Sequence, residues 1–279
     1  YYGRSLVIYE DLGDKYGMGA ILCNIGLVHS DRDDYDKAQD YYGRSLVIQE
    51  DLGDKYGMGV TLHNIGILHY YKNDYEKALH YYERSLAIQE ELGDRASIGL
   101  SLENIGFVHS DKGYYEKALD YYGRSLAIRE ELGDKSGVGG SLNDIGIVHV
   151  NKSDYDTALD CYGRSLAIRE ELGDKYGMGA TLHNIGILYY YKGDYEEAEE
   201  YLEKSLAIQK EIGLKEIGLE TTTYLYLTYK YFGKKYDKNK IYELIKEAKN
   251  IEFELNYALY QLLEDKSYLE TAYNQVQEK

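Results

Sequence analysis

The sequence predicts an all-α protein, a right-handed α-α superhelical solenoid built from tandem helix hairpins. Three observations carry this prediction. The string Tyr-Tyr-x-Arg-Ser-Leu begins at residues 1, 41, 81 and 121 and recurs in altered form at 161 and 201, so the period is 40 residues. Within each period, apolar residues recur at the three- to four-residue spacing of an amphipathic helix, in two runs separated by a turn. The 279 residues include no Pro, which suits long uninterrupted helices.

The second full period shows how each hairpin is delimited. A first apolar run, residues 62–69, ends at the turn signal Asn73-Asp74. A second run, residues 78–88, ends at Gly93-Asp94. Gly93 is suited to cap the end of one helix and Asp94 to cap the start of the next, because Gly accepts a left-handed backbone and Asp accepts hydrogen bonds from free N–H groups. Each period therefore predicts helix, turn, helix.

The period defines three parts of the chain. We expect residues 1–12 to be the second helix of a truncated repeat, residues 13–212 to be five tandem 40-residue repeats, and residues 213–279 to be degenerate C-terminal repeats that cap the array. In the last part, residues 216–232 and 237–249 predict one helix pair, and residues 251–264 and 266–278 a shorter one. Since residue 1 falls inside a repeat, we expect the chain to be a fragment of a longer protein.

Small residues recur where two helices must approach closely. One set falls on the first helix of each hairpin: Gly26, Gly66, Gly106, Gly146 and Gly186. Another falls on the second helix: Ala38, Ala78, Ala118, Ala158 and Ala198. A Gly inside a helix costs about 1 kcal/mol relative to Ala, so a bulky side chain is expected to pack against each one. We expect the tyrosines equivalent to Tyr35 to fill this role, and the arginines equivalent to Arg44 to form ion pairs between repeats.

These motifs resemble the tetratricopeptide repeat. The resemblance lies in Asn-Ile-Gly, Asp-Tyr, Lys-Ala-Leu, Tyr-Tyr and Ser-Leu taken in order, over residues 1–212 and more weakly beyond. The family's usual Pro at the end of the second helix is replaced by Glu50, Glu90, Glu130 and Glu170. The period of 40, longer than the family's common one, is similar to that of the Leu-Gly-Asn polarity adaptors and of bacterial sensor proteins. The resemblance implies a scaffold that binds proteins or peptides in a concave groove lined by first helices.

Composition restricts the partners. There are 32 Lys and Arg against 49 Asp and Glu, a net charge of −17, which argues against nucleic acid and against anionic membranes as partners. A protein or peptide of basic or amphipathic character is compatible with this charge. Cys23 and Cys161 lie more than three repeats apart, so we expect unpaired thiols and a reducing, cytoplasmic location. No segment is apolar for long enough to span a membrane.

By resemblance to the family, the groove residues lie around Asn-Ile-Gly and up to two turns after it. The predicted groove consists of the Asn position, its preceding neighbour, and the residues three, six and seven positions later. Its members are Asn24, Leu27, His63, Asn64, Ile67, Tyr70, Tyr71, Glu103, Asn104, Phe107, Asn143, Asp144, Ile147, His183, Asn184, Ile187, Tyr190 and Tyr191.

The asparagines allow two interpretations. Because an amide both donates and accepts hydrogen bonds, a series of them can bind the peptide groups of a ligand without selecting its sequence. Alternatively, each Asn bridges neighbouring first helices inside the array. The predicted groove contains no Lys or Arg, so we expect no clamp for a C-terminal carboxylate.

Catalysis and metal binding are not expected. His29, His69, His109 and His149 recur once per repeat, but equivalent atoms of successive repeats lie about 8–10 Å apart, too far to share one ion. We therefore expect packed histidines, no cofactor and no enzyme activity in this chain. The predicted function is a protein- or peptide-binding scaffold or regulatory module. The alternatives are a solenoid that self-assembles end to end, and the sensor arm of a larger signalling enzyme whose catalytic domain lies outside these residues.

Overall fold

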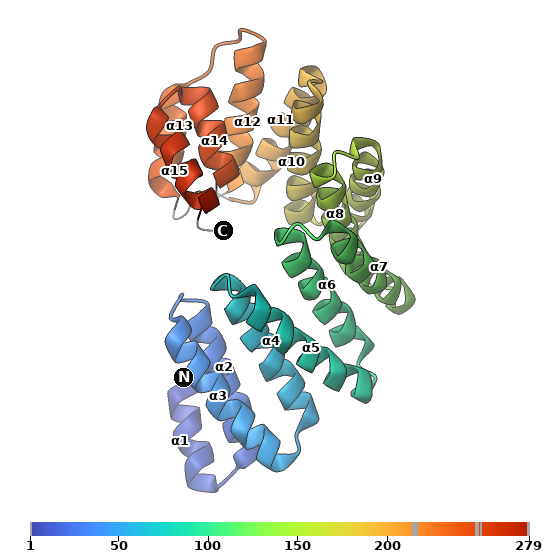
Figure 1. Ribbon diagram of the computed structural model, residues 1–279, viewed down its shortest axis with the longest axis vertical. Coiled ribbons are helices and arrows are strands. Elements are labelled where there is room, and N and C mark those ends of the chain that lie inside the picture. The colour runs from blue at the N-terminus through green and yellow to red at the C-terminus, as the bar shows by residue number, and fades with distance from the viewer. Residues whose placement is uncertain (1, 214–216, 249–250, 252, 278–279) are drawn as a thin grey trace. The chain divides into compact units, whose positions relative to one another are not determined.

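A computed structural model describes residues 2–213, 217–248, 251 and 253–277. This described part contains fifteen helices and no strand. Consecutive helices pack as antiparallel hairpins, so the all-α solenoid class is confirmed (Figure 1). The helices are α1 (Tyr2–Leu12), α2 (Lys15–Ser30), α3 (Tyr35–Leu52), α4 (Lys55–Tyr71), α5 (Tyr75–Leu92), α6 (Arg95–Asp111), α7 (Tyr115–Leu132), α8 (Lys135–Asn151), α9 (Tyr155–Leu172), α10 (Lys175–Lys192), α11 (Tyr195–Glu211), α12 (Ile217–Tyr231), α13 (Lys238–Glu247), α14 (Phe253–Leu263) and α15 (Lys266–Gln277).

The chain divides into two compact units, residues 1–137 and 138–279, and the division falls in the first turn of α8. In the first unit, α2–α3, α4–α5 and α6–α7 are the hairpins. In the second unit, α10–α11 and α14–α15 are tightly packed pairs, and α12 contacts both α13 and α14. Even-numbered helices from α2 to α12 are therefore the first helices of repeats. No helix of the described residues is long and apolar enough to cross a membrane.

Aspartates and glycines set the helix boundaries as the sequence predicts. The side chain of Asp54 accepts a hydrogen bond from the N–H of Gly57 at 3.0 Å, and Asp94 accepts one from Ser97 at 3.2 Å. These bonds satisfy donors that the first turn of a helix leaves free. At the opposite end, Gly93 ends α5 with φ of +68°, a left-handed conformation that costs Gly little. Gly57 thus belongs to the first turn of α4.

In four hairpins a glycine of the first helix contacts a tyrosine ring of the second, and in the α10–α11 hairpin Gly186 contacts Leu202. A Cβ added at Gly66 would lie 2.6 Å from the ring of Tyr82, and Gly26 stands in the same relation to Tyr42. The expectation that Tyr35 and its equivalents fill this role is wrong. Tyr35 lies at the start of α3, where its hydroxyl donates to Asp33, whereas Tyr42 lies two turns later, opposite the glycine. Each such glycine therefore permits the close approach of one large side chain of the facing helix.

A serine fixes the register of each hairpin. Ser45 donates its hydroxyl to the carbonyl oxygen of Gly19 at 2.7 Å, and Ser85 does the same to Gly59. The serines equivalent to these are fully buried and form the same bond at 2.7–2.8 Å: Ser125, Ser165 and Ser205. Because a buried hydroxyl without a partner is costly, this bond disfavours any sliding of the two helices.

The expected ion pairs between repeats come mainly from other residues. Arg84 pairs with Glu50 of the preceding repeat at 3.8 Å, but Arg44 pairs with Asp40 of its own helix. Lys72 and Lys112, in the turns after the first helices, reach back to acidic residues of the preceding repeat. In α3, α7 and α9 the arginine equivalent to Arg44 lies one turn after an aspartate. The arginine reaches this aspartate of its own helix more easily than an acidic residue of the preceding repeat, which explains why these three pairs lie within one helix.

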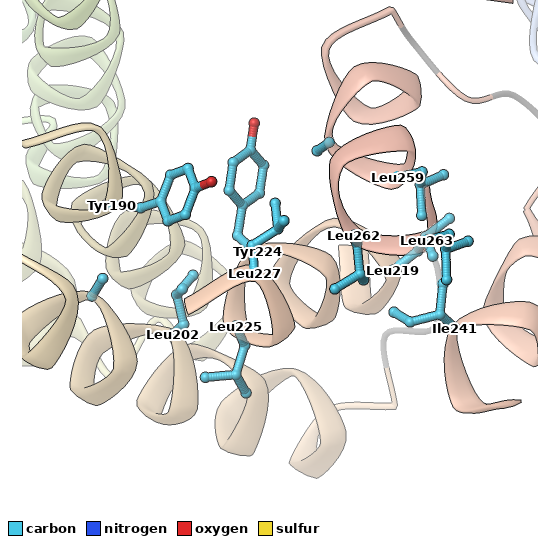
Figure 2. Packing of buried hydrophobic residues seen from close by; sticks show 12 residues of the cluster. Tyr190, Leu202, Leu219, Tyr224, Leu225, Leu227, Ile241, Leu259, Leu262 and Leu263 are labelled. Carbon is cyan, nitrogen blue, oxygen red and sulfur yellow. The ribbon is translucent and has the colours of Figure 1, made fainter. Parts of the chain in front are cut away.

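The C-terminal helices share one apolar core. Leu219 of α12, Ile241 of α13 and Leu259 and Leu262 of α14 are each at most 2% exposed and belong to the same cluster (Figure 2). The 40-residue register continues into α12, where Tyr224 occupies the position of the asparagines. Beyond α12 the helices shorten, and α13 has ten residues where the preceding second helix, α11, has 17.

Candidate peptide-binding surface

Exposed apolar side chains lie along one side of the first helices, and α4 carries the fullest set. Tyr56, Val60 and Tyr71 follow one another along α4 with Asn64 and Ile67 between them, at spacings of three and four residues that place all five on one side of the helix. Tyr56 and Tyr71 are 65% and 61% exposed. We call this stripe, and its equivalents on the other first helices, the first-helix face. The other exposed large members are Tyr16, Leu27 and Leu100 in the first unit, and Ile147, Tyr176, Tyr191 and Tyr231 in the second.

The asparagines on this face hold neighbouring first helices together. Asn64 donates its side-chain N–H to the Cys23 sulfur at 3.5 Å. Asn104 donates to His63 Nε2 at 3.2 Å, and Asn184 donates to Asn143 Oδ1 at 3.0 Å. In every case the acceptor is the residue that precedes the Asn position one repeat earlier. The structural interpretation of the asparagines is therefore realised at these three positions.

The same asparagines keep acceptor capacity for a ligand. Asn64, Asn104 and Asn184 are half-buried, and no described residue donates a hydrogen bond to their Oδ1 atoms. Since one amide hydrogen is used between repeats, the oxygen is held in a fixed direction. Asn24 is exposed and Asp144 is half-buried. Ligand contact by the asparagines stays a prediction, and the two interpretations are compatible.

The residues that precede the asparagines lie between helices. His63, Glu103, Asn143 and His183 are all 9% exposed or less. Burial lowers the pKa of His63 to about 4, so its ring is neutral at pH 7. Because Nε2 accepts from Asn104, the proton is on Nδ1, which faces the Ser101 hydroxyl at 3.2 Å. Glu103 pairs with Arg129 at 2.6 Å. These four predicted groove residues therefore lie buried beneath the first-helix face, where they hold its side chains in position.

The remaining predicted groove residues differ in exposure. Leu27 and Ile147 are exposed, while Ile67, Phe107 and Ile187 are half-buried. The hydroxyl of Tyr70 donates to Asp111 of the next first helix at 2.7 Å, and burial raises the pKa of Tyr70. Tyr190 is buried against other tyrosine rings, but Tyr191 is 51% exposed. The tyrosines seven positions after the asparagines are therefore the most accessible aromatic members of the predicted set.

Several residues of this face are absent from the sequence prediction. Tyr16, Tyr56 and Tyr176 lie eight positions before the asparagines, and Val60 and Leu100 lie four before. Residues four and eight positions before the asparagine lie on the same side of the helix, nearer its start, so helical periodicity alone could have identified these residues. The family resemblance directed attention to the residues after Asn-Ile-Gly.

The histidines that recur once per repeat are packed against tyrosines. His29, His69 and His109 stack on the tyrosine of the facing helix with ring centroids 5.4 Å apart. Cys161 stands where that tyrosine would face His149, and His149 Nδ1 lies 3.0 Å from Asp154, a contact that His29 also makes with Asp34 at 3.2 Å. Within the part of the chain that the structure describes, no group of His, Cys, Asp or Glu is arranged to hold a metal. Burial raises the pKa of the Cys161 thiol, which keeps it protonated and unreactive at pH 7.

A family model describes this architecture. The tetratricopeptide repeat model matches residues 17–91, 97–171 and 137–211. The chain therefore belongs to the tetratricopeptide repeat family. No curated protein matches the chain in sequence.

Solved structures share the fold at low identity. Aspartyl phosphate phosphatase F from Bacillus subtilis is 16% identical with a TM-score of 0.74, over 98% of this chain and 74% of that chain. A Rap protein solved in complex with competence and sporulation factor is 16% identical, TM-score 0.67, over 95% and 69%. A signal transduction ATPase with a tetratricopeptide repeat sensor, from Pyrococcus horikoshii, is 19% identical, TM-score 0.68, over 84% of this chain but 36% of that chain.

Proposed function

We propose that this chain is a binding module that captures a polypeptide segment on the first-helix face of its repeats and does not catalyse a reaction. The observation that carries the proposal is the repeated stripe of exposed tyrosine and aliphatic side chains with an asparagine carbonyl oxygen at its centre. Tyrosine offers a large, rigid apolar surface with one polar end, and it is enriched at the energetic centres of protein interfaces.

Two further observations support a polypeptide as the ligand. The asparagine recurs in four of the five 40-residue repeats, with Asp144 in the other, so side-chain oxygens on the face can bind a chain-like molecule whose peptide groups also recur. A protein of the same fold, the Rap protein, was solved in complex with competence and sporulation factor. The net charge of −17 favours a segment that carries basic residues, because opposite charge accelerates encounter and disfavours acidic competitors.

A selection experiment tests the proposal. Random 12-residue peptides displayed on phage are selected against the purified chain, and the enriched peptides are synthesised and titrated by calorimetry. We expect Tyr71→Ala or Tyr191→Ala to weaken binding by about 2 kcal/mol, the cost of removing an aromatic anchor. The matched control is Tyr114→Ala, since Tyr114 is also half-exposed but lies in the turn before α7.

The result that would overturn the proposal is equally concrete. If every enriched peptide binds the tyrosine variants of the first-helix face as tightly as the original chain, the face is not the binding surface. If selection enriches no peptide at all, capture of a short segment is excluded as the function.

A second candidate is a sensor arm within a longer protein. It is favoured by the Pyrococcus horikoshii protein, which carries a tetratricopeptide repeat sensor and of which this chain covers 36%. Such an arm would use the same first-helix face to receive its signal. Self-assembly is the third candidate, and concentration-dependent light scattering of the purified chain distinguishes it from the other two.

A further inference from the structure

A pocket of about 480 Å³ lies between α12 and α14 in the second unit. Leu227, Lys230 and Tyr231 line it from α12, and Tyr260, Gln261 and Glu264 line it from α14. This volume falls within the range of about 300–1,000 Å³ that is typical of sites for small ligands. The pocket can therefore hold a long side chain.

The repeat register places this pocket on the first-helix face. Lys230 and Tyr231 stand 40 residues after Tyr190 and Tyr191. One repeat earlier, the Tyr190 ring fills the junction between first helices, where it contacts the rings of Tyr224 and Tyr231. At the equivalent position in α12, the Lys230 side chain extends to α14 rather than filling such a junction, and the space beside Tyr231 is open. The pocket is thus an opening in the same face that we propose binds a polypeptide.

Two tyrosines line the pocket, and one of them is held in place by a ring stack. The Tyr231 ring stacks on Tyr195 with centroids 4.4 Å apart and planes 11° apart, which fixes one wall. Tyr260 of α14 contributes the other aromatic side chain. Leu227 is 2% exposed and adds an apolar lining. Because tyrosine faces attract cations, two such walls favour a positively charged or planar group.

The two charged groups of the pocket form one ion pair, which leaves the carboxylate with free acceptor positions. Lys230 Nζ donates to the carbonyl oxygen of Gln261 at 2.7 Å and to Glu264 Oε1 at 2.8 Å, so two of its three hydrogens are used internally. Glu264 is 75% exposed, and its bond to Lys230 lowers its pKa, so it is ionised at pH 7. A carboxylate can accept several hydrogen bonds at once, which leaves Glu264 able to bind a further donor.

We propose that this pocket binds the guanidinium group of an arginine side chain, held against Tyr231 and Tyr260 and paired with Glu264. A planar guanidinium stacks on aromatic rings and pairs with a carboxylate through two parallel hydrogen bonds, which an ammonium group cannot do. The pocket would anchor one arginine of the captured polypeptide. This anchoring role rests on the proposed function, whereas arginine binding itself does not.

The test uses Nα-acetyl-arginine amide as the probe and the full chain, labelled with ¹⁵N. Titration followed by NMR is expected to shift the side-chain amide of Gln261 and the backbone amides of residues 260–264. The citrulline analogue, which has the same shape and no charge, is expected to bind at least fivefold more weakly. Equal binding of the two probes, or shifts confined to other residues, would overturn the proposal.

Two substitutions are expected to act in opposite directions, so that misfolding cannot explain both. Glu264→Gln removes the carboxylate charge and should weaken arginine binding about fivefold, the upper value for an exposed ion pair. Lys230→Met removes the competing cation and should strengthen it severalfold. The matched control is Glu270→Gln in α15, an exposed carboxylate outside this pocket, which should change nothing.

The opposite pattern identifies an anion site. If Lys230→Met weakens binding and Nα-acetyl-glutamate amide binds better than the arginine probe, the pocket recognises a carboxylate and the proposal is wrong. Failure of this proposal can be distinguished from failure of the proposed function. If the arginine probe binds but selection enriches no peptide, only the arginine pocket is supported. If selected peptides bind but the arginine probe does not, only the first-helix face is supported as a binding surface.

Discussion

Gly66→Ala tests the close approach of glycine and tyrosine within a hairpin. A methyl group at this position would lie 2.6 Å from two ring carbons of Tyr82, a side chain that is 1% exposed. Replacing a helical Gly with Ala by itself stabilises a helix by about 1 kcal/mol. Forcing an extra carbon into a packed core costs about 1–3 kcal/mol. We therefore expect a net decrease of up to about 2 kcal/mol in the free energy of unfolding.

Gly123→Ala is the matched control. Gly123 lies inside α7, and a methyl group there meets no atom within 4 Å. The equivalent position in α5 is already Glu83, which shows that a side chain fits. We expect Gly123→Ala to increase the free energy of unfolding by about 0.5–1 kcal/mol. Urea denaturation followed by circular dichroism at 222 nm measures both. If Gly66→Ala stabilises the protein as much as Gly123→Ala, the proposed reason for the repeated glycines is wrong.

The remaining predictions concern the N-cap residue Asp94, the titration of His63 and the accessibility of the Cys161 thiol. Asp94→Ala should lower the free energy of unfolding by about 1 kcal/mol, because the N–H of Ser97 loses its acceptor; an unchanged urea midpoint would contradict this. The pKa of His63 falls from about 6.5 unfolded to about 4 folded, so the unfolded chain binds more protons between these values. Stability should therefore fall by up to about 3 kcal/mol as the pH falls from 6.5 to 4, and His63→Gln should remove that share of the slope in parallel denaturation curves. Cys161 should react with a thiol reagent at a rate that rises with urea, and fast reaction in the native protein would show that the thiol is accessible.

The repeat period alone was sufficient to predict the fold. Because each tandem repeat shows the same residues at its helix boundaries, the caps at Gly93 and Asp94 could be recognised without a structure. Assignments that depend on the facing helix were less secure. The partner of the glycine is Tyr42 or its equivalent in four hairpins and Leu202 in the fifth. The sequence pattern could not distinguish the position of Tyr42 from that of Tyr35, since both are tyrosines of the same helix.

The surface was predicted in part for a similar reason. The family resemblance included Tyr71 and Tyr191 in the predicted groove, and the structure leaves both exposed. It could not show that His63 and His183 turn between neighbouring first helices, because burial there depends on the helix of the next repeat. The pocket beside Lys230 lies between α12 and α14, outside the strict repeat, where the sequence offers no second copy for comparison.

Site-specific photo-crosslinking tests the central claim most directly. A benzoyl-phenylalanine replaces Tyr71 on the first-helix face in one variant and Val47, a 59% exposed residue of the second helix α3, in another. Each variant is irradiated with a selected peptide, and the adducts are measured by mass spectrometry. Capture on the first-helix face predicts adducts from position 71 and none from position 47. Adducts from position 47 with none from position 71 would show that the peptide binds a different surface.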